Sequence, residues 1–244
     1  MPPSHPSPAP AGRVDDLPTV AALAALWREV TARPLWRRPY TLTYLRLWRR
    51  MRLRPMDPQG VRRLSPRGKV NDCSGCTDLC CVGPRSTVLL RLRDLAILKD
   101  LGRLDLVARE KPRFAPEELA RTPALSRQVA SEGWRRMPVL RQDAMGACAA
   151  LTPEGKCSLY PHWPSACERF PYALHADTRE VFYSSRCDSF WIREDGEPAA
   201  RRMAVAAVES YNRRIEDAIL LAYAPESLRE LGLHPERWRS VKSL

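Results

Sequence analysis

Four of the chain's eight cysteines lie within nine residues, in the segment NDCSGCTDLCC at 71–81. This first group comprises Cys73, Cys76, Cys80 and Cys81, and a second group comprises Cys148, Cys157, Cys167 and Cys187. Thiols at short range can form disulfides, ligate metal or make a redox pair. Residues 1–16 lack the basic and apolar regions of a secretory signal, so we expect a cytoplasmic protein. In a reducing cytoplasm, clustered cysteines are better explained by metal ligation than by four disulfides.

The first group contains a Cys-x-x-Cys pair, Cys73 and Cys76, surrounded by the turn-forming residues Asn, Asp, Ser and Gly. A tight turn brings such side chains to one side, where two thiolates can bind one ion and backbone amides can donate to the sulfurs. Cys80 and Cys81 are adjacent, so an extended backbone points them to opposite faces; they serve two sites, or one of them is packed. A thioredoxin-like redox pair fits less well, because it leaves six cysteines unexplained.

The second group has single cysteines, with eight and nine residues between the first three. A zinc ribbon would repeat Cys-x-x-Cys instead. Eight thiolates suit two zinc sites with four cysteines each, or one four-cysteine iron–sulfur cluster, of the 4Fe-4S type, together with a second centre. The spacing alone leaves zinc and iron–sulfur open.

Few other side chains indicate chemistry. His162 could ligate metal or hydrogen-bond a ligand sulfur, although an exposed loop histidine explains it slightly better. Arg169 could offset cluster charge or lie in solvent, and we interpret Asp94 as a helix N-cap. The carboxylates assigned to the solvent side of the last helix are Glu209, Glu216 and Asp217. The sequence has no phosphate-binding glycine loop, nucleophile elbow or dinucleotide fingerprint, so only a metal centre offers a basis for catalysis.

The chain is strongly basic, with a formal charge of +12 and a pI of about 9.7. Such a charge suits an anionic partner such as nucleic acid or a membrane surface. No groove-reading motif accompanies it, however, and heavy use of Arg also follows from the coding bias of a GC-rich bacterial genome. No apolar run is long enough to cross a membrane.

The N-terminal part divides into a tail and two helical stretches. Residues 1–16 are rich in Pro, Ser and Ala, and we expect them to be disordered. Apolar residues at helical spacing from Leu17 predict a helix that ends before Pro34. A second amphipathic stretch at 40–54 carries five arginines. Its apolar stripe favours packing on a domain over a membrane-surface or nucleic-acid role.

Between the cysteine groups, Val88 to Leu92 predict a short strand. A helix should follow, beginning at Asp94 and ending at Gly102. Its inward-facing residues are Leu95, Leu98 and Leu101. We expect residues 103–145 to be mostly helical and irregular, with breaks at prolines. The second cysteine group lies in loop-rich sequence, where VFYS predicts a short strand.

The clearest helix covers residues 198–223. Its apolar face comprises Met203, Ala207, Tyr211, Ile215, Ile219 and Ala222. We expect this helix to close over the cysteine region. No internal repeat is evident.

We therefore predict a mostly α protein with short strands, in which helices flank an irregular cysteine-rich, metal-centred core. The expected segments are a disordered tail at 1–16, a basic helical segment at 17–58, a cysteine-cluster metal-binding domain at 59–197 and a helical segment at 198–244 that packs on it. Metal ligation should also supply folding energy, because a loop-rich cysteine segment makes few other contacts.

The chain resembles the bacterial YkgJ-like cysteine-cluster family, a zinc- or iron-chelating domain. That family carries Cys-x-x-Cys-x-x-Cys-Cys, an apolar segment with an Asp that starts a helix, and the patterns Cys-x-x-Leu, Cys-x-Ile-Tyr and Arg-Pro-x-x-Cys-Arg-x-Phe-Pro. The corresponding text here is CSGCTDLCC, VLLRLRDLAIL, CAAL, CSLY and WPSACERFP. The resemblance covers about residues 71–191 and implies metal binding by the cysteines.

Three positions depart from the family pattern. Three residues separate Cys76 from Cys80 instead of two, and Trp163 and Glu168 stand where the family commonly has Arg. The longer spacing is similar to that of the flagellin lysine methylases, which carry an iron–sulfur cluster on such cysteines. This second resemblance implies an enzyme that modifies a protein substrate.

Three functional hypotheses follow, in this order. The first is a metal-binding protein without catalysis, used for storage, delivery or structure. The second is a metal-dependent enzyme that modifies a protein, for example by lysine methylation. The third is a nucleic-acid-associated module that uses the Arg-rich stretch.

Overall fold

The computed structural model describes residues 13–32, 55–58, 62–63, 69–71, 81–82, 87–111, 113, 120, 137–175, 180–183, 190–192 and 197–234. About half of them are helical, and the strands are short, which confirms the expected combination of elements. The helices are α1 (Pro18–Ala32), α3 (Leu92–Asp100), α6 (Ser165–Glu168), α7 (Glu197–Tyr223) and α8 (Pro225–Glu230), with the 3₁₀ helices η1 (Val14–Asp16) and η3 (Leu104–Leu106). The strands are β1 (Arg62–Arg63), β2 (Lys69–Asn71), β3 (Val107–Glu110), β4 (Met137–Leu140), β5 (Tyr172–His175), β6 (Glu180–Tyr183) and β7 (Phe190–Ile192).

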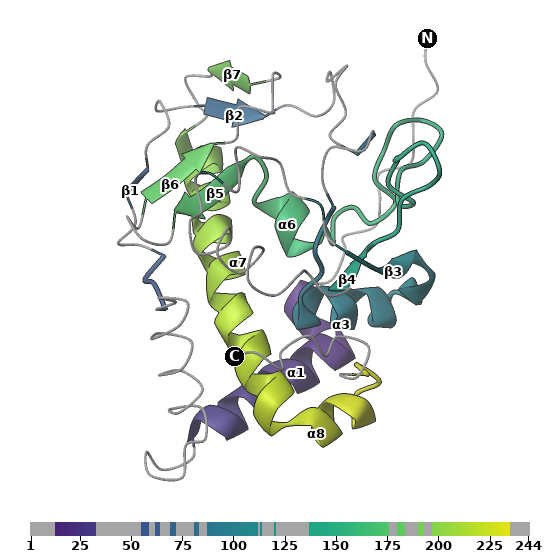
Figure 1. The fold of residues 1–244 in the computed structure, drawn as a ribbon. Helices are drawn as coiled ribbons and strands as arrows, with labels where there is room; N and C mark the ends of the chain where they lie inside the picture. The colour runs from purple at the N-terminus through teal and green to yellow at the C-terminus, as the bar shows by residue number, and fades with distance from the viewer. Residues whose placement is uncertain are drawn as a thin grey trace.

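The longest helix, α7, runs through the middle of the described structure (Figure 1) and contacts α1, α6, α8, β2, β5 and β6. Its predicted apolar face is confirmed at Ala207, Ile215 and Ile219, which are buried, whereas Ala222 is exposed. The N-terminal half of α7 shares a hydrophobic cluster with β5 and β6. The C-terminal half shares a second cluster with α1, α3 and α8. One helix therefore connects both cores.

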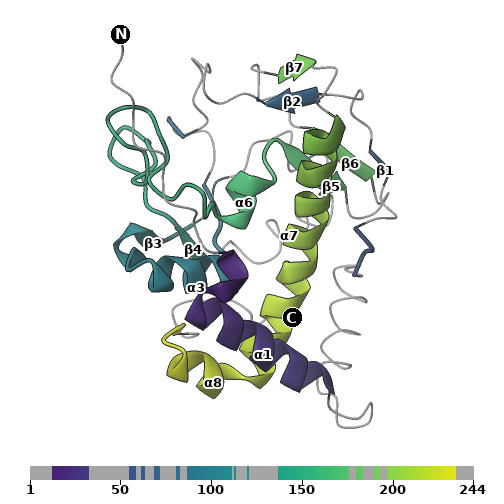
Figure 2. The same ribbon diagram turned by 180° about the vertical axis from the view of Figure 1, so that it is seen from behind.

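Helices α1 and α3 pack against each other (Figure 2). A carboxylate from α3 caps α1. The Asp100 Oδ2 atom accepts the backbone N–H of Thr19 at 2.9 Å and that of Val20 at 3.3 Å, and its Oδ1 accepts the Thr19 hydroxyl. The first N–H groups of a helix have no partner within the helix, and a negative charge there also suits the helix dipole. Asp100 therefore fixes where α1 starts.

Helix α3 begins at Leu92, two residues earlier than expected, and its N-cap is Arg91 rather than Asp94. Asp94 lies in the first turn and accepts the backbone N–H of Arg91 at 2.8 Å. The predicted inward leucines are confirmed: Leu95 and Leu98 are each 1% exposed, and Leu101 is partly buried. The helix ends as expected at Gly102, whose φ of 67° suits a residue without a Cβ.

The prediction that residues 103–145 are mostly helical is wrong for most of the described residues there, although η3 is a short 3₁₀ helix. Strands β3 and β4 pair antiparallel there, with Val107 opposite Leu140. The strand predicted at Val88 to Leu92 is reduced to one bridge, between Leu89 and Val139. Val139 is fully buried, and a β-branched residue in such a position favours a strand.

Two further sheets contain strands within or beside the cysteine-containing segment. The strand predicted at VFYS is β6, which pairs antiparallel with β5 and parallel with β1. Strand β2 pairs antiparallel with β7, with Asn71 opposite Phe190. Because β2 precedes the first cysteine group and β7 follows Cys187, this pairing joins the two ends of the segment that holds all eight cysteines.

Much of the N-terminal region for which the sequence predicted a tail and a basic stretch is not described by the structure. Residues 1–12 of the predicted tail and the basic stretch at 40–54 lie outside the described residues. Within the predicted tail, η1 forms a 3₁₀ helix directly before α1. None of the described helices is both long and apolar enough to cross a membrane.

Replacing Asp100 with Ala should lower the free energy of unfolding by about 1–2 kcal/mol, because the first N–H groups of α1 lose their acceptor. Urea or thermal unfolding measures this loss. Asp105→Ala is the control, since the Asp105 side chain is 56% exposed and its ion pair with Arg103 lies at the surface; it should change stability by less than about 0.5 kcal/mol. Equal stability of the Asp100 variant and the wild type would contradict the capping role.

Candidate metal centre

Half of the predicted ligands lie within the described residues, and all four are partly buried. These are Cys81, Cys148, Cys157 and Cys167. The others, Cys73, Cys76, Cys80 and Cys187, lie outside the described residues. The backbone N–H of Cys148 donates to the carbonyl oxygen of Cys81 at 2.7 Å. One residue of the first group therefore lies directly beside the beginning of the second group.

Cys148 and Cys157 occupy turns whose backbone amides point at the sulfur. The amides of Ala150 and Leu151 lower the pKa of the Cys148 thiol, and those of Leu159 and Tyr160 lower the pKa of the Cys157 thiol. The Leu151 and Tyr160 N–H groups also donate to the carbonyl oxygens of Cys148 and Cys157, at 2.9 and 3.2 Å. Each pair of amides lies two and three residues after its cysteine. Hydrogen bonds of this kind stabilise a thiolate and orient it toward a metal.

The two turns are copies of one structural unit, nine residues apart, which the sequence did not reveal as a repeat. In each unit the chain closes on itself before the cysteine: Asp143 N–H donates to Ala147 O at 2.8 Å, and Thr152 N–H donates to Lys156 O at 2.7 Å. A glycine with positive φ stands two residues before each cysteine, Gly146 at 82° and Gly155 at 74°. The repeated pattern Gly-x-Cys, at 146–148 and 155–157, is the sequence signal that could have revealed this repeat.

The same repeat anchors each turn in the hydrophobic core. The residue two positions after each cysteine is buried: Ala150 and Leu159 are each 1% exposed. Both belong to the cluster formed by α1, α3 and α7. The second cysteine group is therefore attached to the helical core at regular intervals, although its own backbone is mostly turns.

Cys167 lies in α6, a single helical turn that follows Pro164 and rests against α7. The first residue of this turn, Ser165, is 2% exposed and bonds to Asp94 in α3. Helix α6 thereby brings the third cysteine of the second group toward the two amide-lined turns.

The four described thiols lie close enough to influence one another electrostatically. Burial raises the pKa values of the Cys148 and Cys157 thiols, and it raises the pKa of Cys167 well above its usual value. The charge of Cys81 raises all three pKa values further. Charged thiolates in this arrangement repel one another, and a bound cation would turn that repulsion into attraction.

The structure does not show a complete ligand set. Within the described residues, no three Cys, His, Asp or Glu side chains are placed so that they could hold one metal ion. The predicted metal-centred core is therefore not shown, and four of its expected ligands lie outside the described residues. What the structure shows is the approach of Cys81 to three cysteines of the second group.

Residues 72–190 match a family model named CxxCxxCC and described as "Putative zinc- or iron-chelating domain". We refer to this matched segment, which is similar to that family, as the CxxCxxCC domain. The match agrees with the resemblance seen in the cysteine motifs, and its ends coincide with the β2–β7 pairing. The description supports metal binding and does not choose between zinc and iron. No curated protein and no solved structure matches the chain.

Other side chains of the CxxCxxCC domain differ from expectation. His162, expected to be exposed, is partly buried, and its Nδ1 is buried without a hydrogen-bond partner in the described structure. Arg169 donates to the Tyr172 carbonyl at 3.0 Å. Trp163 is 41% exposed and meets Tyr160 edge to face, with ring centroids 5.1 Å apart.

The carboxylates of α7 also differ from the expected solvent-facing set. The Glu209 side chain is 44% exposed, as expected, and pairs with Arg213 at 3.3 Å. Glu216 is partly buried, and burial raises the pKa of its carboxyl. Asp217 is only 16% exposed, because α7 packs it against the start of α3, where it accepts the Leu92 N–H at 3.4 Å and lies 3.9 Å from the Arg91 guanidinium.

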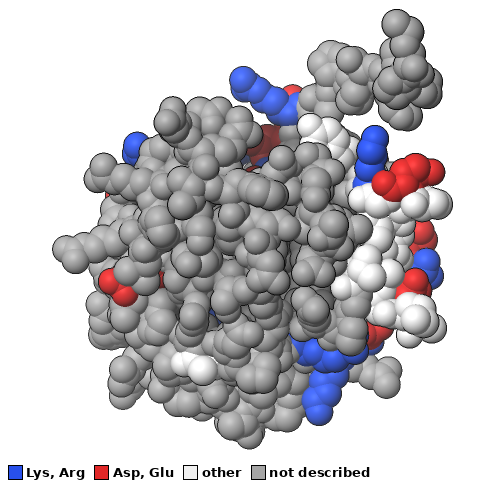
Figure 3. Space-filling model, turned by 90° about the horizontal axis from the view of Figure 1, so that it is seen from above, with Lys and Arg blue, Asp and Glu red and all other residues white. Residues whose placement is uncertain are grey.

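The net charge of +12 does not form a single basic patch on the described part of the face shown in Figure 3. Lys and Arg side chains alternate there with Asp and Glu side chains. The basic stretch at 40–54, which carried the nucleic-acid hypothesis, lies outside the described residues.

Asp217 should make stability depend on pH. Burial raises its pKa from 3.8 to about 7, against the opposing effect of Arg91. An acid whose pKa rises on folding stabilises the fold while protonated, so this contribution is complete below 3.8 and is lost as the pH rises to about 7. Asp217→Asn should therefore melt at a higher temperature than the wild type at about pH 8, and the difference should vanish near about pH 4.

Thermal unfolding across this pH range measures the effect of Asp217→Asn. Glu209→Gln serves as the control on the same helix, because the Glu209 side chain is 44% exposed, against 16% for Asp217. A lower melting temperature of Asp217→Asn at high pH would show that the ion pair with Arg91 outweighs burial.

Proposed function

We propose that the CxxCxxCC domain of this protein binds zinc or an iron–sulfur cluster, of the 4Fe-4S type, through thiolates from both cysteine groups. The observation that carries the proposal is the position of Cys81. Its carbonyl accepts the Cys148 N–H, and its thiol interacts electrostatically with Cys148, Cys157 and Cys167. Residues that are far apart in the sequence are thus gathered as a bipartite site requires.

The β2–β7 pair joins the two ends of the segment that carries all eight cysteines. Cys73 follows β2 by two residues, and Cys187 precedes β7 by three. Because a residue spans at most about 3.6 Å of extended chain, both lie a short reach from the paired strands. This closure supports the assignment of all eight cysteines as ligands.

The donor set of the described residues suits either metal centre. Zinc and iron–sulfur clusters both prefer cysteine thiolates, and the amide-lined turns around Cys148 and Cys157 favour the charged form that either one needs. A bound metal would supply the positive charge that holds the thiolates together. The chain itself presents the sulfurs, donates the amides and partly buries the site.

We infer a cytoplasmic role in metal storage, delivery or structure, ahead of a metal-dependent enzyme that modifies a protein. A nucleic-acid-associated module ranks third. Among the described residues, no contact favours either alternative over simple metal binding. The ordering therefore rests on the gathered thiols and on the family description.

Replacing Cys157 with Ser should lower metal affinity by more than about tenfold and should also lower the melting temperature, because metal ligation supplies folding energy. Elemental analysis of anaerobically purified full-length protein, followed by thermal unfolding, measures both effects. Full metal content in this variant would contradict the assignment.

Ser158→Ala provides the matched control in the same turn. Ser158 is exposed, and within the described part of the chain its hydroxyl receives a long hydrogen bond from Arg103 at 3.4 Å. We expect this variant to keep the metal content and the melting temperature of the wild type.

A further inference from the structure

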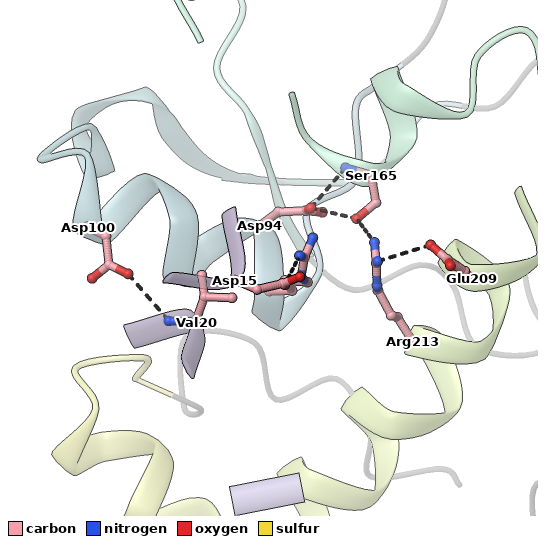
Figure 4. A network of polar contacts seen from close by, with 8 residues as sticks. Asp15, Val20, Asp94, Asp100, Ser165, Glu209 and Arg213 are labelled. Carbon is pink, nitrogen blue, oxygen red and sulfur yellow. Dashed lines mark hydrogen bonds and ion pairs between the residues drawn. The ribbon is translucent and has the colours of Figure 1, made fainter. Parts of the chain in front are cut away.

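A buried carboxylate from α3 holds the first residue of α6. Asp94 is 1% exposed, and its Oδ1 accepts both the backbone N–H of Ser165, at 2.9 Å, and the Ser165 hydroxyl, at 2.6 Å (Figure 4). Its Oδ2 accepts the Arg91 N–H at 2.8 Å. Asp94 thus binds three donors, two of them on the element that carries Cys167.

The network continues from Ser165 into α7. The Arg213 guanidinium donates to the Ser165 hydroxyl oxygen at 3.2 Å, and its other nitrogen donates to Glu209 at 3.3 Å. Figure 4 shows Asp94, Ser165, Arg213 and Glu209 joined by successive polar contacts that run from α3 through α6 to α7. Helix α6 is therefore tied to both major helices through its first residue.

This attachment matters because α6 has only four residues. Isolated helices of that length do not persist in water, so α6 depends on contacts from outside itself. Cys167 follows Ser165 by two residues, and its own N–H donates to Pro164 O at 2.8 Å. Where Ser165 is held, the position of the Cys167 sulfur is therefore also set.

Charge alone does not account for Asp94. Its negative charge raises the pKa of the Cys167 thiol, so electrostatically it opposes the thiolate that a metal needs. A buried carboxylate is also costly unless donors satisfy it. The three donors offset that cost, and what the carboxylate contributes in return is a fixed geometry.

We propose that Asp94 is a positioning residue, which places Cys167 for metal binding by holding Ser165 at the start of α6. This inference rests on the proposed function, because it requires Cys167 to be a ligand. Residues that orient metal ligands in this way commonly change metal affinity by about 10–100-fold when they are removed.

Cobalt(II) titrated into reduced, metal-free, full-length protein tests the proposal. The thiolate-to-cobalt absorption band grows with the number of thiolates bound. Cys167→Ser removes one ligand and sets the reference for its loss. Asp94→Ala should give the same reduced band and a cobalt affinity about 10–100-fold below that of the wild type.

Two further variants keep the test decisive. Ser165→Ala removes the hydroxyl but retains the backbone bond to Asp94, so a smaller loss is expected, and this variant decides the question if Asp94→Ala does not fold. Asp100→Ala is the matched control, because it removes a hydrogen-bonded carboxylate from the other end of α3 without touching α6. It should keep the full band.

The outcomes distinguish a failure of Cys167 as a metal ligand from a failure of Asp94 as a positioning residue. A full band in Cys167→Ser would overturn Cys167 as a ligand and with it the positioning role. A reduced band in Cys167→Ser, but full bands in Asp94→Ala and Ser165→Ala, would overturn the positioning role and leave metal binding intact. Equal losses in Asp94→Ala and Asp100→Ala would also overturn it, because they would reflect a general loss of stability.

Discussion

Thiolates gathered in a partly buried site repel one another, and the described structure around Cys81, Cys148, Cys157 and Cys167 is arranged to hold them together in spite of this. Burial and mutual charge both raise the pKa values of the second-group thiols. Hydrogen bonds from backbone amides lower the pKa values of Cys148 and Cys157. The balance still favours neutral thiols until a cation is present, which makes a metal the natural completion of the CxxCxxCC domain.

Contacts with the helical core hold the cysteine-bearing turns in this arrangement. Ala150 and Leu159 fix the two cysteine turns in the cluster formed by α1, α3 and α7. Asp94 and Arg213 fix α6 from α3 and α7, and the β2–β7 pair closes the ends of the cysteine segment. Loops that would be poorly ordered alone are therefore attached at several points to elements that are stable for other reasons.

The sequence predicted what repeats at helical spacing and missed what depends on tertiary contacts. Helices α1, α3 and α7 follow from their apolar faces and their end signals. Strands β3 and β4 were missed because four-residue strands give little periodicity, and Pro138 lies inside one of them. The cysteines that we propose as ligands were chosen from their spacing, and this choice stays a prediction. The link from Asp94 to Ser165 spans 71 positions, and no local pattern in the sequence reveals it.

The central claim is that the cysteines of the CxxCxxCC domain hold a metal centre, and the most direct test is the metal content of the protein. Anaerobic purification should be followed by a visible spectrum and by analysis for iron, zinc and acid-labile sulfide. The account predicts either iron and sulfide with a broad band near about 400 nm, or colourless protein with tightly bound zinc. Folded protein that contains none of these metals, and takes up neither zinc nor iron under reducing conditions, would contradict it.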